Sequence, residues 1–233
     1  MKYHGSMDAV DYRTREHSYI SRVYSWMCAA LIISGIVAMY TVSTGMFYYL
    51  VMPKYQMIFF GLIILELVMV IALSRFINKM QYSVAALVFI AFSVLNGVVI
   101  SAIIAAFTAN SVASAFFACA ATFAIMSMVG WYTKKDLTSI GQLCFMGLIG
   151  IIVASVVNIF WANNALYWAI NYIGVLIFVG LIAYDTQKIK RMGAFYEVNS
   201  DAAKKSALLG ALALYLDFIN LFLMLLNILG NRR

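Results

Sequence analysis

Seven apolar runs, each long enough to cross a lipid bilayer, dominate this amino-acid sequence. An α-helix needs about 20 apolar residues to span a hydrocarbon core of about 30 Å. Because lipid offers the backbone no hydrogen-bond partners, a spanning segment of this length must be helical. The sequence therefore predicts an all-α, polytopic integral membrane protein with spans at about residues 23–45, 57–76, 84–107, 113–131, 140–162, 166–186 and 206–229.

The composition excludes a soluble globular domain. Apolar residues make up 65% of the chain and charged residues 11%, against roughly 45–50% and 25% in average soluble proteins. The single proline, Pro53, lies in the first loop, so proline kinks none of the predicted helix interiors. We expect a cytoplasmic N-terminal tail over residues 1–22, one seven-helix transmembrane domain over 23–229 and a short C-terminal tail over 230–233.

The basic residues predict the orientation of the chain. The net charge is +7, but the basic side chains flank apolar runs instead of forming a dense patch, so we expect no nucleic-acid partner. Cytoplasmic loops are rich in Lys and Arg. A cytoplasmic N-terminus places on the inner side Lys2, Arg13, Arg15, Arg22, Arg75, Lys79, Lys134, Lys135, Lys188, Lys190, Arg191, Lys204 and Lys205, and leaves outside Lys54, Arg232 and Arg233. A re-entrant last segment would return the last two to the inner side.

Asp217 is the most informative polar residue, because it lies about 11 residues, or roughly 17 Å of helix, inside the last apolar run. A carboxylate at that depth needs a partner, a water-filled cavity or a proton, which favours a functional role. Asp217 also belongs to a stripe of small and polar residues, which we expect to face protein or water while the opposite face meets lipid. The stripe consists of Ser206, Gly210, Ala213, Asp217, Asn220, Met224 and Asn227.

Two further acidic residues lie within or at the edge of predicted spans. Asp185 is followed by three cations, so a solvated ion pair at the inner interface would also account for it. Glu66 lies nine residues before Arg75, too far for a pair on one helix turn. We expect Glu66 either to pair across helices or to carry a proton, in a structural or a functional role.

Small residues recur every three or four positions on two other spans, which predicts close helix packing. The third span carries Ser93, Gly97, Ser101 and Ala105, and the fifth carries Gly147, Gly150, Ala154 and Asn158. The cysteines Cys28, Cys119 and Cys144 all lie inside apolar runs without metal-ligand spacing, so we expect them to be small packing residues.

The motifs around the two aspartates resemble those of a known family. Residues 174–178 (GVLIF), 183–188 (AYDTQK), 210–222 (GALALYLDFINLF) and 132–137 (YTKKDL) closely resemble the bacterial branch of the Bax inhibitor-1 family. The resemblance implies a bacterial inner-membrane protein in which the last helix is central. It further implies that the protein acts as a pH-sensitive calcium leak. It also implies that an aspartate pair, here Asp185 and Asp217, is the pH sensor. Some relatives engage a basic residue that ends the second helix, for which Arg75 is the nearest candidate.

If the two aspartates meet, their chemistry follows from like-charge repulsion. Two adjacent carboxylates cannot both ionise cheaply, so the pair shares a proton over some pH range. Loss of the proton either separates the helices or recruits a hard cation such as calcium. Asn220 lies nearby, but calcium prefers six to eight oxygens, so we expect transient passage of a permeant ion rather than a bound cofactor. Counting residues alone gives the aspartates a depth difference on the order of 10 Å, so the pairing follows from the resemblance.

Two other function classes remain as alternatives. Intramembrane aspartyl proteases carry Gly-x-Gly-Asp and a later Pro-Ala-Leu, whereas this chain has Leu214-Tyr215-Leu216-Asp217 and no proline after Pro53. We therefore expect no enzyme. A non-conducting regulator with membrane-protein partners fits the sequence as well, whereas the leak needs only the lipid bilayer, calcium ions and protons as partners.

Overall fold

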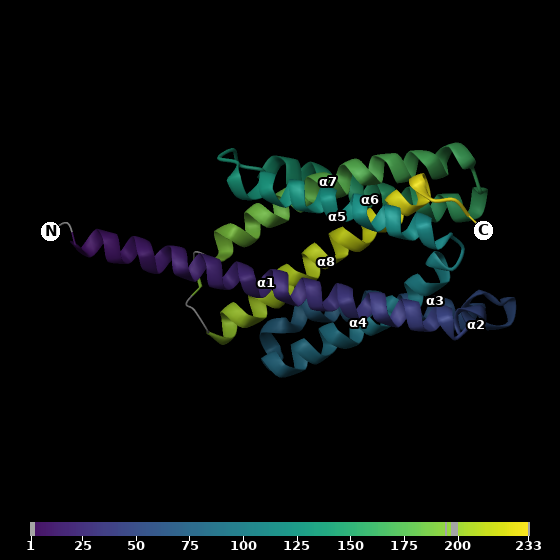
Figure 1. Cartoon of the computed structure of the whole chain (residues 1–233), viewed down its shortest axis with the longest axis horizontal. Coiled ribbons are helices and arrows are strands. Elements are labelled where there is room, and N and C mark those ends of the chain that lie inside the picture. Colours follow the sequence, from purple (N-terminus) through teal and green to yellow (C-terminus); the bar gives the residue numbers. More distant parts are fainter. Residues whose placement is uncertain (1–2, 194, 197–199, 233) are drawn as a thin grey trace. The chain divides into compact units, whose positions relative to one another are not determined.

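Seven long helices form the protein in this computed structural model, which describes residues 3–193, 195–196 and 200–232, with side chains from residue 16 onward (Figure 1). Lys2 and Arg233 of the charge count lie outside the described residues. The long helices are α1 Tyr3–Ser43, α3 Gln56–Phe76, α4 Tyr82–Ile104, α5 Ala109–Tyr132, α6 Thr138–Trp161, α7 Asn164–Gly193 and α8 Asp201–Leu229. All seven are long and apolar enough to cross a membrane, which confirms the predicted fold class.

The short elements lie in the loops. The first loop contains α2, Phe47–Val51, and the 3-10 helix η1, Pro53–Tyr55, while η2, Ile77–Lys79, follows α3. Within the described residues the only extended pairing is an isolated bridge between Phe107 and Arg232. The first 22 residues, expected to form a tail, are helical from Tyr3 onward, and the apolar part of α1 begins at Glu16.

The chain forms two compact units, which are described separately. The first contains Met1–Ala106 and Arg191–Tyr215, and the second contains Phe107–Lys190 and Leu216–Arg233. The last helix, α8, therefore contributes its first half to one unit and its second half to the other.

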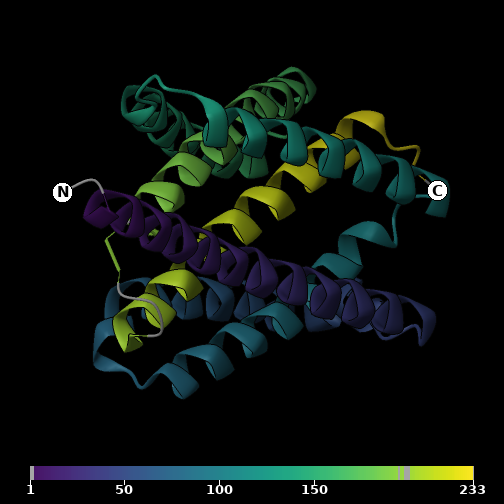
Figure 2. The same ribbon diagram turned by 60° about the vertical axis from the view of Figure 1, so that its left-hand side comes forward.

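In the first unit, α4 packs against both α1 and α3 (Figures 1 and 2). A Cβ atom added at Gly97 would lie 2.6 Å from the carbonyl oxygen of Ser34, so only glycine permits this approach of α1 to α4. Ser93 and Ser101, on the same face of α4, are fully buried. The packing face predicted on the third span is confirmed for Ser93, Gly97 and Ser101, whereas Ala105 is half-buried and follows the end of α4.

In the second unit, α5 and α6 approach α7 closely. A Cβ atom added at Gly130 would lie 2.2 Å from the carbonyl oxygen of Ala183, and one at Gly141 would lie 2.5 Å from the ring of Tyr184. Two contacts fix α7 antiparallel to α8. Asn227 donates a hydrogen bond of 3.1 Å to Asn171, and the sulfur of Met224 covers Gly174.

The packing face predicted on the fifth span is partly wrong. Gly147 does meet Ile177, but Gly150 is exposed and has no atom within 4 Å of an added Cβ. Asn158, placed on that face, instead accepts a hydrogen bond of 2.9 Å from the backbone N–H of Asn163 just beyond α6. A spacing of small residues cannot distinguish a helix neighbour from lipid, because both accept a small side chain.

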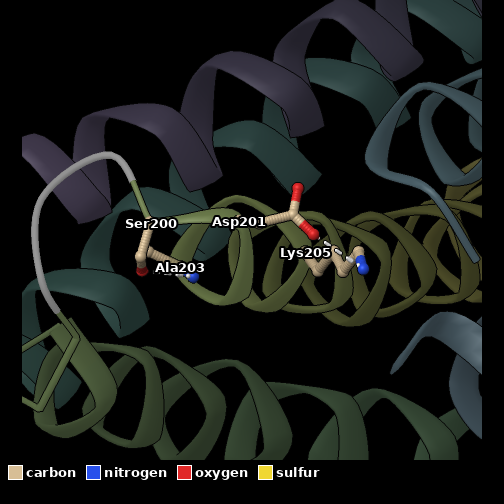
Figure 3. A network of polar contacts seen from close by, with 4 residues as sticks. All are labelled: Ser200, Asp201, Ala203 and Lys205. Atoms are coloured by element: carbon tan, nitrogen blue, oxygen red, sulfur yellow. Dashed lines mark hydrogen bonds and ion pairs between the residues drawn. The ribbon is translucent and has the colours of Figure 1, made fainter. Parts of the chain in front are cut away.

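The start of α8 follows from local capping (Figure 3). The Ser200 hydroxyl accepts a hydrogen bond of 3.1 Å from the backbone N–H of Ala203, which is the usual role of serine before a first helical turn. Asp201 places a negative charge in that turn, where the helix dipole favours it. Asp201 also pairs with Lys205 at 2.7 Å. The helix thus begins five residues before the predicted span.

The last helix is the most buried of the seven, with 56% of its most apolar stretch buried. This agrees with the expectation of a central last helix. The expectation that one face would meet lipid is wrong, because large and small residues off the polar stripe are also at most 3% exposed: Ala207, Leu208, Ala211, Leu212, Leu214 and Tyr215. The stripe members Gly210 and Ala213 are only half-buried.

Candidate functional site: a buried carboxyl pair

Asp185 and Asp217 lie on α7 and α8 in the second unit and are 8% and 5% exposed. The glycine contacts described above hold the preceding residues of α7, Ala183 and Tyr184, tightly against α5 and α6. The Asp185 side chain is therefore presented from a fixed stretch of helix. On α8, Phe218 beside Asp217 packs edge-to-face on Phe123 of α5, which fixes the other carboxyl group.

The two aspartates contact each other, and their carboxyl groups are close enough to share a hydrogen bond. A carboxylate has no hydrogen to donate, so this bond requires a proton on one of the two groups. We refer to Asp185 and Asp217 as the carboxyl pair. The residue count along each helix predicted separate depths, but such a count holds only for helices of equal tilt.

One oxygen of the carboxyl pair is left without a partner. Among the buried side-chain oxygen and nitrogen atoms in the described part of the chain, Oδ2 of Asp217 alone makes no hydrogen bond. A buried polar atom without a partner is costly, and such atoms in native structures call for an explanation such as an unseen water or ion. A proton held between the two carboxyl groups would satisfy this oxygen.

Two further side chains lie near the carboxyl pair: Lys188, one of the cations expected beside Asp185, and Cys144, which was not expected there. Lys188, one turn beyond Asp185, is close enough to act on it electrostatically, and its ammonium group lies 5.9 Å from the Tyr184 ring centre. Cys144 of α6 lies close enough to Asp217 to interact with it. The sequence predicts only a packing role for Cys144, because nothing in its spacing links it to α8.

The pair does not by itself form a calcium cage. No group of three or more His, Cys, Asp or Glu side chains with metal-binding geometry occurs within the described residues. Asn220 lies one turn beyond Asp217, but its amide nitrogen donates a hydrogen bond of 2.8 Å to the carbonyl of Leu216 on the same helix. The available oxygens therefore fall short of the six to eight that calcium prefers.

The remaining predicted residues, Arg75 and Glu66, belong to the first unit. Arg75 lies in the last turn of α3 with its side chain exposed. Glu66 is half-buried and accepts a hydrogen bond of 2.9 Å from the amide of Asn96 on α4. The prediction that Glu66 pairs across helices is therefore confirmed.

Comparison with known proteins gives one consistent family. Residues 16–233 match the family described as inhibitor of apoptosis-promoting Bax1. The chain is 45% identical over 217 residues to the inner membrane protein YbhL of Escherichia coli K12. The aligned region covers 93% of this chain and 92% of YbhL. It is 41% identical to an uncharacterized protein of Rickettsia prowazekii, over 92% of this chain and 90% of that protein.

Proposed function

The chain belongs to the Bax inhibitor-1 family, and from this membership we propose that it is a pH-sensitive cation leak of a bacterial inner membrane. Calcium is the proposed permeant ion, and the carboxyl pair is the proposed sensor. The observation that carries the proposal is the buried contact of Asp185 with Asp217, in which Oδ2 of Asp217 has no hydrogen-bond partner outside the pair. The inner-membrane location is taken from the relative YbhL.

The proposed mechanism follows from the proton that the pair must hold. With the proton in place, one neutral and one charged carboxyl group bind each other and keep α7 against α8. Loss of the proton leaves two like charges in a site of low dielectric, where repulsion is far stronger than in water. The charges are relieved when the helices separate or when a cation binds both groups. Deprotonation therefore opens the path and at the same time creates a site for a cation.

The surroundings of the pair support passage rather than storage of the ion. The pair and the nearby Asn220 supply too few oxygens to hold calcium tightly. A weak site lets an ion leave as readily as it enters, which conduction requires. Lys188 near Asp185 reduces the net negative charge at the pair and further weakens cation binding.

We also propose that the N-terminus is cytoplasmic. The support is the excess of Lys and Arg in alternate loops, which places 13 of the 16 basic residues on that side. In this orientation Lys188, Lys190 and Arg191 near the end of α7 lie at the inner surface. Cations that cross the pair would then enter the cytoplasm past this basic end.

Calcium flux into proteoliposomes across a pH series tests the proposal. The intact protein should conduct more as the pH rises. Asp185→Asn and Asp217→Asn each leave one carboxylate that ionises without repulsion, so both variants should lose the pH dependence. Asp201→Asn, at an exposed position, is the matched control and should behave as the intact protein.

Two outcomes would contradict the proposal. If both pair variants kept the pH dependence of the intact protein, the carboxyl pair would not be the sensor. If the pure protein carried no cation at any pH, the alternative of a non-conducting regulator with membrane-protein partners would be favoured.

A further inference from the structure

A second polar cluster lies in the first unit, and neither Asp185 nor Asp217 belongs to it. It joins four side chains from four helices by hydrogen bonds: Glu66 of α3, Asn96 of α4, Tyr215 of α8 and Ser34 of α1. The distances are 2.9 Å from Asn96 to Glu66, 2.7 Å from Tyr215 to Asn96 and 2.6 Å between the hydroxyls of Tyr215 and Ser34. We refer to these four residues as the hydrogen-bond chain.

The hydrogen-bond chain lies deep within its helices. Glu66 is ten residues from either end of α3, which is about 15 Å of helix, and Tyr215 is at the centre of α8. Asn96 is 9% exposed, Ser34 3% and Tyr215 0%. Glu66 is the only carboxyl group of the cluster, so any charge there must be stabilised by this chain of neutral groups.

No opposite charge lies near Glu66. In the described part of the chain its hydrogen-bond partner is Asn96, and the titratable group that faces it is the phenol of Tyr215. The elements packed on α3 carry their cations far along the helix axis: Lys54 on η1 and Lys79 on η2 are 12 and 13 residues away, or about 18–20 Å. The helix α4 contains no charged residue. Glu66 thus lacks the ion pair that normally accompanies a charge at this depth.

The direction of the hydrogen bonds depends on whether Glu66 is charged. A carboxylate only accepts, so Asn96 must donate its N–H to Glu66 and turn its oxygen toward Tyr215. Tyr215 then donates its only hydroxyl hydrogen to the side-chain oxygen of Asn96, as in the observed arrangement. Ser34 is left with one proton for three acceptors, the Tyr215 hydroxyl and the backbone carbonyls of Ser93 and Ala30.

A proton on Glu66 allows the opposite direction over the same heavy-atom distances. Glu66 donates to Asn96, whose amide has turned by half a rotation, and Asn96 donates to Tyr215. Tyr215 donates to Ser34, and Ser34 donates to the Ser93 carbonyl at 2.7 Å. Every proton now has an acceptor of its own. No O–H or N–H bond breaks in this reversal, because the amide and the hydroxyls only rotate.

We propose that Glu66 is a second proton-binding site of this protein, independent of the carboxyl pair. Binding of a proton to Glu66 reverses the donor and acceptor roles along the hydrogen-bond chain. The hydrogen bonds that Ser34 makes therefore depend on whether Glu66 is protonated. Ser34 lies at a close approach of α1 to α4, opposite Gly97. The proton on Glu66 therefore changes the bonds at a helix crossing two helices away. This inference does not rest on the proposed leak function.

Infrared spectroscopy of the protein in lipid nanodiscs, with glutamate labelled by carbon-13, tests the proposal. The chain has three glutamates, Glu16, Glu66 and Glu197, so the label separates them from every aspartate. A labelled carboxylic-acid C=O band should be present at low pH and absent at high pH. The part of this band that belongs to Glu66 should be lost in Glu66→Gln, leaving that of Glu16 and Glu197, and should persist in the double variant Asp185→Asn, Asp217→Asn. A band that is constant at all pH, or absent at all pH, would overturn the proton site.

A second variant tests the hydrogen-bond chain itself. Asn96→Leu removes the acceptor of the Glu66 proton, so the labelled C=O band should move to the higher frequency of a carboxylic acid without a hydrogen bond. Asn163→Leu, at an exposed position after α6, should leave the band in place. An unmoved band in Asn96→Leu would overturn the reversal, whatever the result for the carboxyl pair.

Discussion

In the apolar interior of this protein, a few hydroxyl and carboxyl groups provide the hydrogen bonds of the buried polar side chains. Tyr215 is fully buried, and its hydroxyl contacts both Asn96 and Ser34. We expect Tyr215→Phe to destabilise the protein by about 1–3 kcal/mol, because it removes two buried hydrogen bonds and leaves the side-chain oxygen of Asn96 without its donor. Thermal unfolding in detergent measures the effect. Tyr172→Phe, at an exposed position on α7, is the control, and equal losses in the two variants would contradict the argument.

The residues of the carboxyl pair could be predicted from the sequence, whereas most of their partners could not. Asp217 is conspicuous because a charge in the middle of an apolar run is costly. Tyr215 and Asn96 are not conspicuous, since a tyrosine or an asparagine in a span has many possible roles. Their partners come from helices far apart in the sequence, and only the packing of those helices brings them together.

At the scale of the helix, one side of α5 packs against protein and the other does not. Ala115 is fully buried, whereas Ala113 is exposed. We expect Ala115→Leu to cost about 1–3 kcal/mol, because added bulk in a filled contact strains its neighbours. Ala113→Leu should change the stability by no more than about 0.5 kcal/mol. Unfolding of the two variants in the same detergent compares them, and equal stabilities would contradict the orientation of α5.

Replacing a helix glycine by alanine is expected to lower or raise the stability of the protein, according to what lies beside that glycine. Gly130→Ala places a methyl group against the backbone oxygen of Ala183, so α5 and α7 must separate, and we expect a loss of about 1–3 kcal/mol. Gly150→Ala meets no atom and should stabilise α6 by about 0.5–1 kcal/mol through lower backbone entropy. Melting temperatures that fall in both variants would show that Gly150 is also a contact.

The sequence predicts the helices better than their faces. Length and hydropathy are properties of one segment, so all seven spans are predicted, most of them to within a few residues, although α1 begins 20 residues earlier and α7 ends seven residues later. The face of a helix depends on what lies beside it. The sequence predicts that the small and polar stripe of α8 faces protein or water. Residues off the stripe, such as Leu208 and Leu214, are buried as well. The less buried side of α8 is the one that carries Gly210 and Ala213, so the stripe does not identify the protein-facing side.

For the molecule as a whole, orientation is the main testable property. α8 is an uninterrupted helix of 29 residues, about 43 Å long at 1.5 Å per residue, and therefore long enough to cross fully. We expect Asn231→Cys to be labelled from outside by a membrane-impermeant reagent, and a cysteine added before Met1 only after the cells are opened. The background should lack Cys28, Cys119 and Cys144. Labelling of residue 231 only in opened cells would contradict the seven-crossing topology.

The division of α8 between two compact units has a consequence for biosynthesis. The first unit needs Arg191–Tyr215 as well as its first 106 residues, so the ribosome must add 109 more residues before this unit can close. At about 5–20 residues per second this takes roughly 5–20 s. Until Tyr215 arrives, Ser34 and Asn96 lack a partner that they have in the finished protein. The nascent first three spans are therefore candidates for a membrane insertase or chaperone that shields them until the last helix is inserted.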